Sequence, residues 1–82
     1  MFHERHEFLP KFKEYNGKIC LFKGDDVDDT YKIYDSQAKE IAPVLQLDVR
    51  ILEGQAYIRF PTYQLYYYTN ILREAGYDIV TL

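Results

Sequence analysis

The sequence predicts a small α/β (α+β) domain in which a mixed β-sheet of about five strands is covered by two main helices. Three observations predict this class. Apolar residues recur at helical spacing in two stretches, short apolar or alternating runs typical of strands surround them, and turn residues separate the runs. The 82 residues suffice for one domain with a modest core. We therefore expect residues 1–82 to form a single domain, with residues 1–16 as an N-terminal helix or arm.

The first expected elements are a helix, a turn and a strand. Residues 4–15 follow a loose helical pattern, which Pro10 interrupts. The dipeptide Asn16-Gly17 indicates a turn. Residues 19–22 are continuously apolar, which is typical of a strand covered on both faces.

A hairpin and a helix are predicted next. The acidic segment 24–29 indicates a loop, and residues 30–34 are β-prone and can pair back onto the preceding strand. Asp35 or Ser36 is suited to cap a helix over 36–45. The buried stripe of this helix has the i, i+3, i+4, i+7 spacing and consists of Ala38, Ile41, Ala42 and Leu45.

The remaining sequence predicts two alternating strands, a helix and a last strand. Apolar residues alternate with polar ones over 47–52 and again over 56–60, with a glycine turn between the two runs. Thr62 is a suitable N-cap for a helix over 62–75. Residues 77–82 are expected to form the final strand of the mixed sheet.

Composition and charge restrict the classes of function. The single cysteine excludes an intramolecular disulfide and favours a reducing, cytoplasmic location. Residues 1–7 lack the apolar segment of a signal peptide, and no stretch approaches the ~18 apolar residues of a membrane span, so we expect no membrane contact. A net charge of −3 is unfavourable for binding nucleic acid, because nucleic-acid binders usually carry a basic surface. The charge is uneven, however, because residues 1–24 carry +2 and residues 25–82 carry −5.

Several short segments occur in an order and spacing that point to one protein family. The segment Leu21-Phe22-Lys23-Gly24-Asp25 forms an apolar strand ending in Gly-Asp, and Tyr31-Lys32-Ile33-Tyr34 precedes a helix. Later positions that fit the same pattern are Pro61, Tyr68, Leu72, Gly76-Tyr77 and Ile79-Val80. Over roughly residues 8–82 the chain thus resembles the N-terminal domain of MutS mismatch-repair proteins. The resemblance implies the fold of that domain and an association with DNA, as part of a repair or mobile-element protein.

The resemblance also identifies the positions at which the family reads a mismatch, and these positions differ here. In the family a Phe stacks on the mispaired base and a Glu two residues later hydrogen-bonds to it; the corresponding residues are Thr30 and Lys32. Thr30 cannot stack on a base, and Lys32 cannot accept a hydrogen bond. The loop before them is four residues longer than in the family and carries carboxylates that repel phosphates, namely Asp25, Asp26, Asp28 and Asp29. The fold is therefore expected without the mismatch-reading chemistry.

Two surfaces are candidates for binding. The leading hypothesis is a DNA-associated accessory module that contacts duplex DNA weakly and without mismatch preference. Its candidate residues are Lys11, Lys13, Lys18, Lys23, Thr30 and Lys32. The alternative is a protein–protein interaction module, without nucleic acid, whose Tyr-rich helix presents Tyr63, Tyr66 and Tyr67 to another protein or a second copy. A helix packed on both sides would instead bury these rings.

We expect a non-enzymatic protein without cofactor or metal. His3 and His6 have the spacing of a metal clip, but a chain terminus supplies no rigid frame for zinc. The aspartates of residues 25–29 could gather calcium, but their spacing does not match an EF-hand. Cys20 lies in an apolar strand, with no base spaced around it, and is expected to be inert packing.

Overall fold

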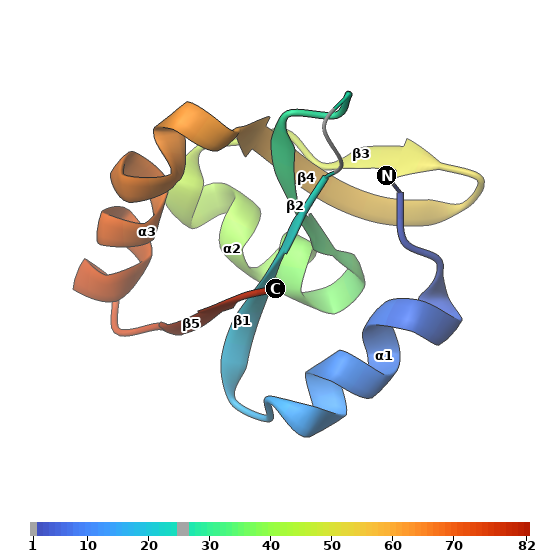
Figure 1. Ribbon diagram of the computed structural model, residues 1–82. Coiled ribbons are helices and arrows are strands. Elements are labelled where there is room, and N and C mark those ends of the chain that lie inside the picture. The colour runs from blue at the N-terminus through green and yellow to red at the C-terminus, as the bar shows by residue number, and fades with distance from the viewer. Residues whose placement is uncertain (1, 25–26) are drawn as a thin grey trace.

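The computed structural model describes residues 2–24 and 27–82 of the chain (Figure 1). Helices and strands follow one another in the predicted order. They are α1 (Arg5–Glu14), β1 (Lys18–Lys23), β2 (Thr30–Tyr34), α2 (Asp35–Leu45), β3 (Arg50–Leu52), β4 (Gln55–Pro61), the 3₁₀ turn η1 (Thr62–Gln64), α3 (Leu65–Glu74) and β5 (Asp78–Thr81). Within the described residues, no helix has the length and apolar character that spanning a membrane requires.

One five-stranded sheet with the order β3-β4-β2-β1-β5 organises the fold. Neighbouring strands are antiparallel, except that β5 runs parallel to β1. The helices α2 and α3 pack on one face of the sheet, and α1 packs on the opposite face (Figure 1). The predicted α/β class with a mixed sheet is therefore confirmed, and α1 forms a third helix beside the two main ones.

The face beneath α2 and α3 holds the larger core. Ile33 of β2 and Ile58 of β4 are fully buried there, against Leu72 of α3. The predicted stripe of α2 is confirmed, because its side chains are all buried in this core: Ala38, Ile41, Ala42 and Leu45. Burial of this apolar stripe is what holds α2 on the sheet, since α2 has no side-chain cap.

The face beneath α1 holds a smaller core of aromatic rings. Phe8 stacks on Tyr34, with ring centroids 4.9 Å apart and ring planes 3° apart. The Tyr34 hydroxyl accepts a hydrogen bond from the His3 backbone N–H at 2.9 Å, and Gln55 Nε2 donates to the His3 carbonyl at 2.6 Å. Burial raises the pKa of Tyr34 to about 12. These bonds fix the segment before α1 across the sheet.

Pro10 does not interrupt α1, in contrast to the prediction. The helix runs without a break from Arg5 to Glu14, with Pro10 exposed on its outer side. A proline removes one helix hydrogen bond, but contacts on the N-terminal side offset this loss. Phe8 is fully buried, and the Glu7 carboxylate accepts from the Glu4 N–H at 3.1 Å.

The predicted helix caps are wrong. Asp35 begins α2 with left-handed backbone (φ 53°), and its carboxylate accepts from Arg5 at 3.4 Å. No side chain caps α2, so neither Asp35 nor Ser36 has that role. Thr62 does not cap α3, because its hydroxyl donates to the Asp29 carboxylate instead. Side chains that the local pattern assigns to capping thus bond instead to partners in distant segments of the chain.

The strand predicted over 47–52 is shorter than expected, because β3 comprises only residues 50–52. The Leu47 N–H donates to the Ala42 carbonyl at 3.0 Å, so Leu47 closes the end of α2 rather than entering the sheet. The apolar side chains of Val49 and Ile51 are 39% and 66% exposed. The alternating pattern is real, but it lies on the edge of the sheet and is not covered.

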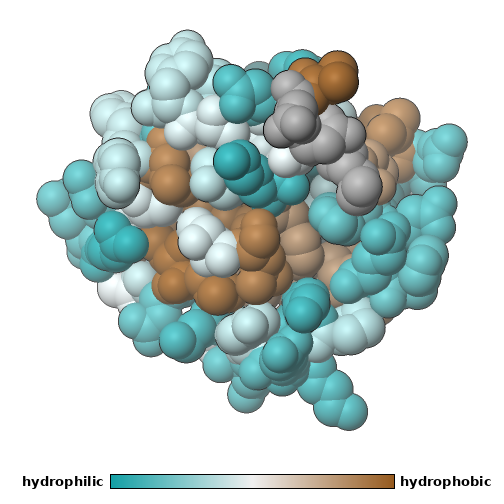
Figure 2. Space-filling view, viewed as in Figure 1, coloured by the Kyte–Doolittle hydropathy of each residue, from teal (hydrophilic) through white to brown (hydrophobic). Residues whose placement is uncertain are grey.

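The other edge of the sheet is formed by β5, whose apolar residues are only partly covered. Figure 2 shows hydrophobic side chains in the centre of this face, over β1 and β5 between α1 and α3. Ile79, Val80 and Leu82 are half-buried here. Both outer strands of the sheet are short, with three residues in β3 and four in β5.

Candidate functional site

The most exposed aromatic side chains of the described residues lie on the outer side of η1 and α3. Tyr63, Tyr66 and Tyr67 are 80%, 76% and 63% exposed. Tyr66 and Tyr67 lie three and four residues after Tyr63, the spacings at which side chains on a helix are neighbours. The prediction that these tyrosines are solvent-exposed is confirmed, and we call this group the tyrosine surface.

The tyrosine surface has a rigid base. The Tyr67 ring contacts Tyr68 edge-on, with centroids 5.0 Å apart, and Tyr68 lies 4.7 Å from Phe60 in the core. Leu72 is fully buried on the opposite side of α3, and the Thr69 hydroxyl donates to the Leu65 carbonyl at 2.8 Å. The inner side of α3 is fixed in this way, so the helix that carries the outward rings has a defined position on the sheet.

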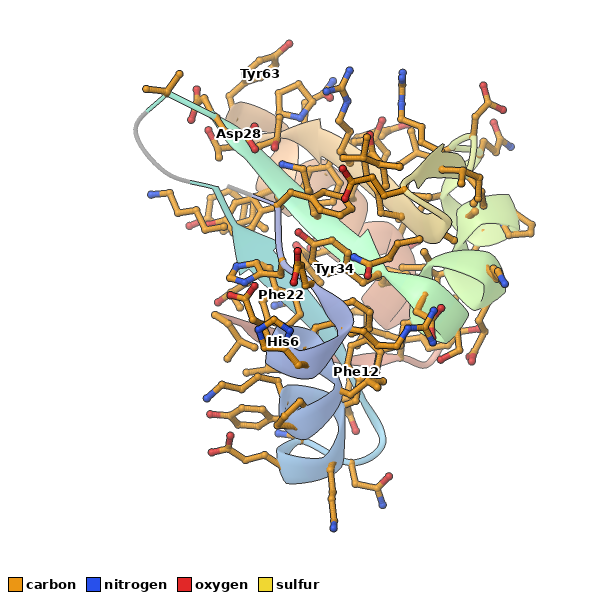
Figure 3. The ribbon with its side chains drawn as sticks, turned by 90° about the vertical axis from the view of Figure 1, so that its right-hand side faces the viewer. His6, Phe12, Phe22, Asp28, Tyr34 and Tyr63 are labelled. Carbon is orange, nitrogen blue, oxygen red and sulfur yellow. The ribbon has the colours of Figure 1, made fainter. Side chains whose placement is uncertain are left out.

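An acidic residue lies beside the Tyr63 end of the tyrosine surface. Near Tyr63, the Thr62 backbone N–H donates to the Asp29 carbonyl at 3.1 Å, so the β1–β2 loop is joined to the start of the helix. Figure 3 shows Tyr63 and Asp28 at the same end of the molecule. At the other end of α3, Glu74 is exposed. A tyrosine ring beside a carboxylate presents a surface that favours positively charged partners.

Thr30 and Lys32, which the resemblance to MutS aligns with the mismatch-reading residues, are engaged within the chain. Lys32 is 5% exposed, and its Nζ donates to the Asp28 carboxylate and, at 3.2 Å, to the Thr30 hydroxyl. The Thr30 hydroxyl in turn donates to Asp28 at 2.6 Å. Burial opposes the charge on Asp28, but the hydrogen bonds from Lys32 and Thr30 outweigh it and hold the pKa of Asp28 well below its ordinary value.

This geometry corrects the expectation that Lys32 contacts a phosphate. A buried ammonium already bonded to a carboxylate is not available to a ligand without breaking that pair. Gly24 permits the arrangement, because a Cβ added there would lie 2.1 Å from the Asp28 carbonyl oxygen. No local pattern in the sequence predicts this pair, because an i, i+4 spacing brings side chains together in a helix and Lys32 lies in strand β2.

The other predicted phosphate contacts do not form one basic groove. Lys11 and Lys23 line a pocket of about 490 Å³ with His3, Phe22 and Leu82. Lys11 already pairs with Glu14 at 3.1 Å, and the pocket also contains Glu7. The remaining two are exposed, with Lys13 on α1 and Lys18 at the start of β1. The structure thus brings Lys11 and Lys23 together and leaves Lys13 and Lys18 outside this pocket.

The potential metal ligands lie apart. His3 Nδ1 is 3.2 Å from Glu7 Oε2, whereas His6 Nδ1 is 3.5 Å from Glu4 Oε2. The hydrogen bonds from Glu4 and His3 lower the pKa of Glu7. Over residues 2–24 and 27–82, three or more His, Cys, Asp or Glu side chains do not gather at any point where a metal ion could be held. Asp25 and Asp26 of the proposed calcium loop lie outside the described residues.

Cys20 is buried in β1 between α1 and the sheet. It has no exposed surface, and its Sγ lies 3.9 Å from the Lys11 carbonyl and 3.8 Å from the Lys18 carbonyl. Burial, together with the negative charge of Glu14, raises the pKa of the thiol. A protonated, inaccessible thiol is a poor nucleophile, which agrees with the expected packing role.

Comparison with known proteins adds no family, because neither a family model nor a curated protein matches this chain. The tyrosine surface is therefore the feature on which a functional argument must rest. The sequence predicts the three tyrosines of this surface, but it does not predict that Asp29 lies beside them. The bond between Thr62 and Asp29 joins residues 33 positions apart, and no local pattern marks such a contact.

Proposed function

We propose that this chain is a non-enzymatic binding module that recognises a partner protein through its tyrosine surface. The observation that carries the proposal is the exposure of Tyr63, Tyr66 and Tyr67 at 80%, 76% and 63% on a helix whose other side is buried. Three neighbouring rings of this size are rarely left in water without a partner. Tyrosines are also enriched among the residues that dominate protein interfaces.

The chemistry around the rings supports a basic partner surface. Asp29 lies at the Tyr63 end of the surface, whereas Arg73 and Glu74 balance each other in charge at the far end of α3. An arginine guanidinium can stack on a tyrosine ring and still reach a carboxylate, whereas a lysine ammonium forms only the point-charge part of this contact. The excess of acidic groups in residues 25–82 increases the attraction of a basic surface.

The proposal is tested with three labelled peptides of equal length, in which alanine alternates with Arg, Lys or Glu. Fluorescence anisotropy at low salt should show the order Arg above Lys, with no binding of the Glu peptide. The double variant Tyr66→Ala/Tyr67→Ala should weaken binding of the Arg peptide by at least about tenfold, because truncating an aromatic anchor costs about 2 kcal/mol. Ser36→Ala, an exposed change on α2, is the matched control. Equal binding of the Arg peptide by both variants would refute the proposal.

Weak binding of duplex DNA is the second candidate function. The observation that favours it is the convergence of Lys11 and Lys23 on one pocket, together with the exposure of Lys13 and Lys18. The resemblance to the MutS N-terminal domain supports the same idea. Such contact would be electrostatic, because Thr30 and Lys32 are engaged with Asp28.

A further inference from the structure

The segment 47–51 is apolar at both ends and at its centre, with one acidic and one basic residue between: Leu47-Asp48-Val49-Arg50-Ile51. Only Arg50 and Ile51 belong to the edge strand β3, which pairs with β4 alone. Val49 and Ile51 are 39% and 66% exposed, and Asp48 and Arg50 are exposed as well. Among the described residues, neither Asp48 nor Arg50 forms an ion pair. This edge therefore carries apolar side chains, a complementary charge pair and an open row of backbone groups.

The hairpin geometry fixes which backbone groups face outward. Glu53 and Gly54 both have positive φ (51° and 77°), as in a two-residue type I′ turn. Leu52 and Gln55 flank this turn and form a hydrogen-bonded pair, so the next pair, Ile51 and Ala56, is non-hydrogen-bonded. The N–H and C=O of Ile51 consequently point away from β4. In an extended chain those of Val49 and Leu47 point the same way, although the Leu47 N–H is already bonded to Ala42.

From this edge we propose that two copies of the chain associate through antiparallel pairing of residues 47–51 about a two-fold axis at Val49. Val49 exchanges both backbone hydrogen bonds with its symmetry mate. Each Ile51 N–H donates to the Leu47 carbonyl of the other copy, a group that remains available in the single chain. Residues 47–49 become strand in the dimer, and the two sheets become continuous across the pair (Figure 1 shows β3 at the outer edge).

The side chains select this register. Asp48 of each copy lies opposite Arg50 of the other, in a non-hydrogen-bonded pair where side chains are closest. Leu47 lies opposite Ile51, and Val49 lies opposite itself, on the other face. A shift of the axis to Arg50 would bring the two Arg50 side chains face to face, and like charges directly opposite are destabilising. The palindromic pattern of acidic, basic and apolar residues thus matches a second copy of this chain.

Sedimentation velocity of the full chain from about 10 μM to about 1 mM tests the proposal, because association depends on concentration. The mass should rise from 9.8 kDa toward twice that value, and exchange of the Val49 amide should slow in parallel. Val49→Pro removes the central donor and should keep the chain monomeric. A chain that stays monomeric throughout, or Val49→Pro that still dimerises, would overturn the proposal.

Charge reversal tests the register independently. Asp48→Arg alone and Arg50→Asp alone each place like charges opposite one another, so each variant should be monomeric. An equimolar mixture of the two should dimerise, because the copy with two arginines then faces the copy with two aspartates. Tyr66→Ala/Tyr67→Ala should dimerise like the wild type, which separates this interface from the tyrosine surface. No recovery in the mixture would contradict the register.

Discussion

The ammonium group of Lys32 on β2 donates a hydrogen bond to the carboxylate of Asp28, four residues earlier in the chain, in the β1–β2 loop. The lysine side chain is 6% exposed and the aspartate side chain 29% exposed, so the pair is shielded on the lysine side and open on the other. Thr30 bonds to both partners. The cluster includes Thr30 and Lys32, which the resemblance to MutS aligns with the mismatch-reading residues. Its effect on the stability of the fold can be measured.

The pair should affect stability asymmetrically. Asp28→Ala removes the carboxylate to which the buried ammonium is bonded, and should lower the free energy of unfolding by about 2 kcal/mol. Lys32→Met removes the buried charge and keeps much of the packing, and should cost clearly less. Urea denaturation of both variants measures the difference. A larger loss for Lys32→Met would show that the ammonium is not the group that needs compensation.

Acid should weaken the fold through Asp28. The folded pKa of this group lies below its ordinary value of about 3.9, so its contribution is present above that pH and is lost as the pH falls toward the folded pKa. We expect the melting temperature of the wild type to fall below pH ~4 more steeply than that of Asp28→Asn. Thermal melts between pH ~2 and ~6 compare the two. If the melting temperatures of both proteins fall equally steeply as the pH is lowered, Asp28 has no special partner in solution.

Tyr34 should hold the N-terminal segment on the sheet. Tyr34→Phe keeps the stacking with Phe8 but removes the acceptor for the His3 N–H. We expect a loss of about 1 kcal/mol and faster hydrogen exchange at His3, while the core amides of β2 stay protected. Unchanged exchange at His3 would indicate that another group fixes this segment.

Any DNA binding should be weak and insensitive to mismatches. We expect a Kd of about 10⁻⁴ to 10⁻⁶ M for matched and G·T-mismatched duplexes alike, and the affinity should fall steeply with added salt. Lys23→Ala and Lys13→Ala should each lower the salt slope by about one unit if those side chains contact phosphates. Lys32→Met is the internal control and should leave the slope unchanged, because that ammonium is buried. Preferential binding of the mismatched duplex would contradict the assignment of Thr30 and Lys32.

The sequence predicted the helices and strands that are determined by burial, but it did not predict the side-chain contacts between distant segments. The stripe Ala38, Ile41, Ala42 and Leu45 predicted α2, because periodic apolar residues must face a core. The predicted cap of this helix was wrong, since the Asp35 carboxylate bonds to Arg5, 30 residues away in the chain. The exposed tyrosines were predicted from their spacing around Leu72, whereas their acidic border depends on a bond between Asp29 and Thr62.

The short strand β3 shows a second reason for error. The alternation over residues 47–52 predicts a strand correctly in kind, but alternation does not say whether a neighbouring strand is present to pair with it. In the single chain, residues 47–49 have no strand partner and stay outside the sheet. The same alternation that overestimated β3 is what identifies this edge as a place for a second copy.

The tyrosine surface is tested most directly by amide chemical shifts of the ¹⁵N-labelled chain during titration with the alternating Arg–Ala peptide. We expect shifts confined to residues 62–74 and to Asp29, and their loss in Tyr66→Ala/Tyr67→Ala. The melting temperature of this variant should be nearly unchanged, because exposed side chains contribute within about 0.5 kcal/mol each. Shifts spread over α1 and the β1 lysines, with α3 unaffected, would contradict the claim that this chain binds its partner through the tyrosines.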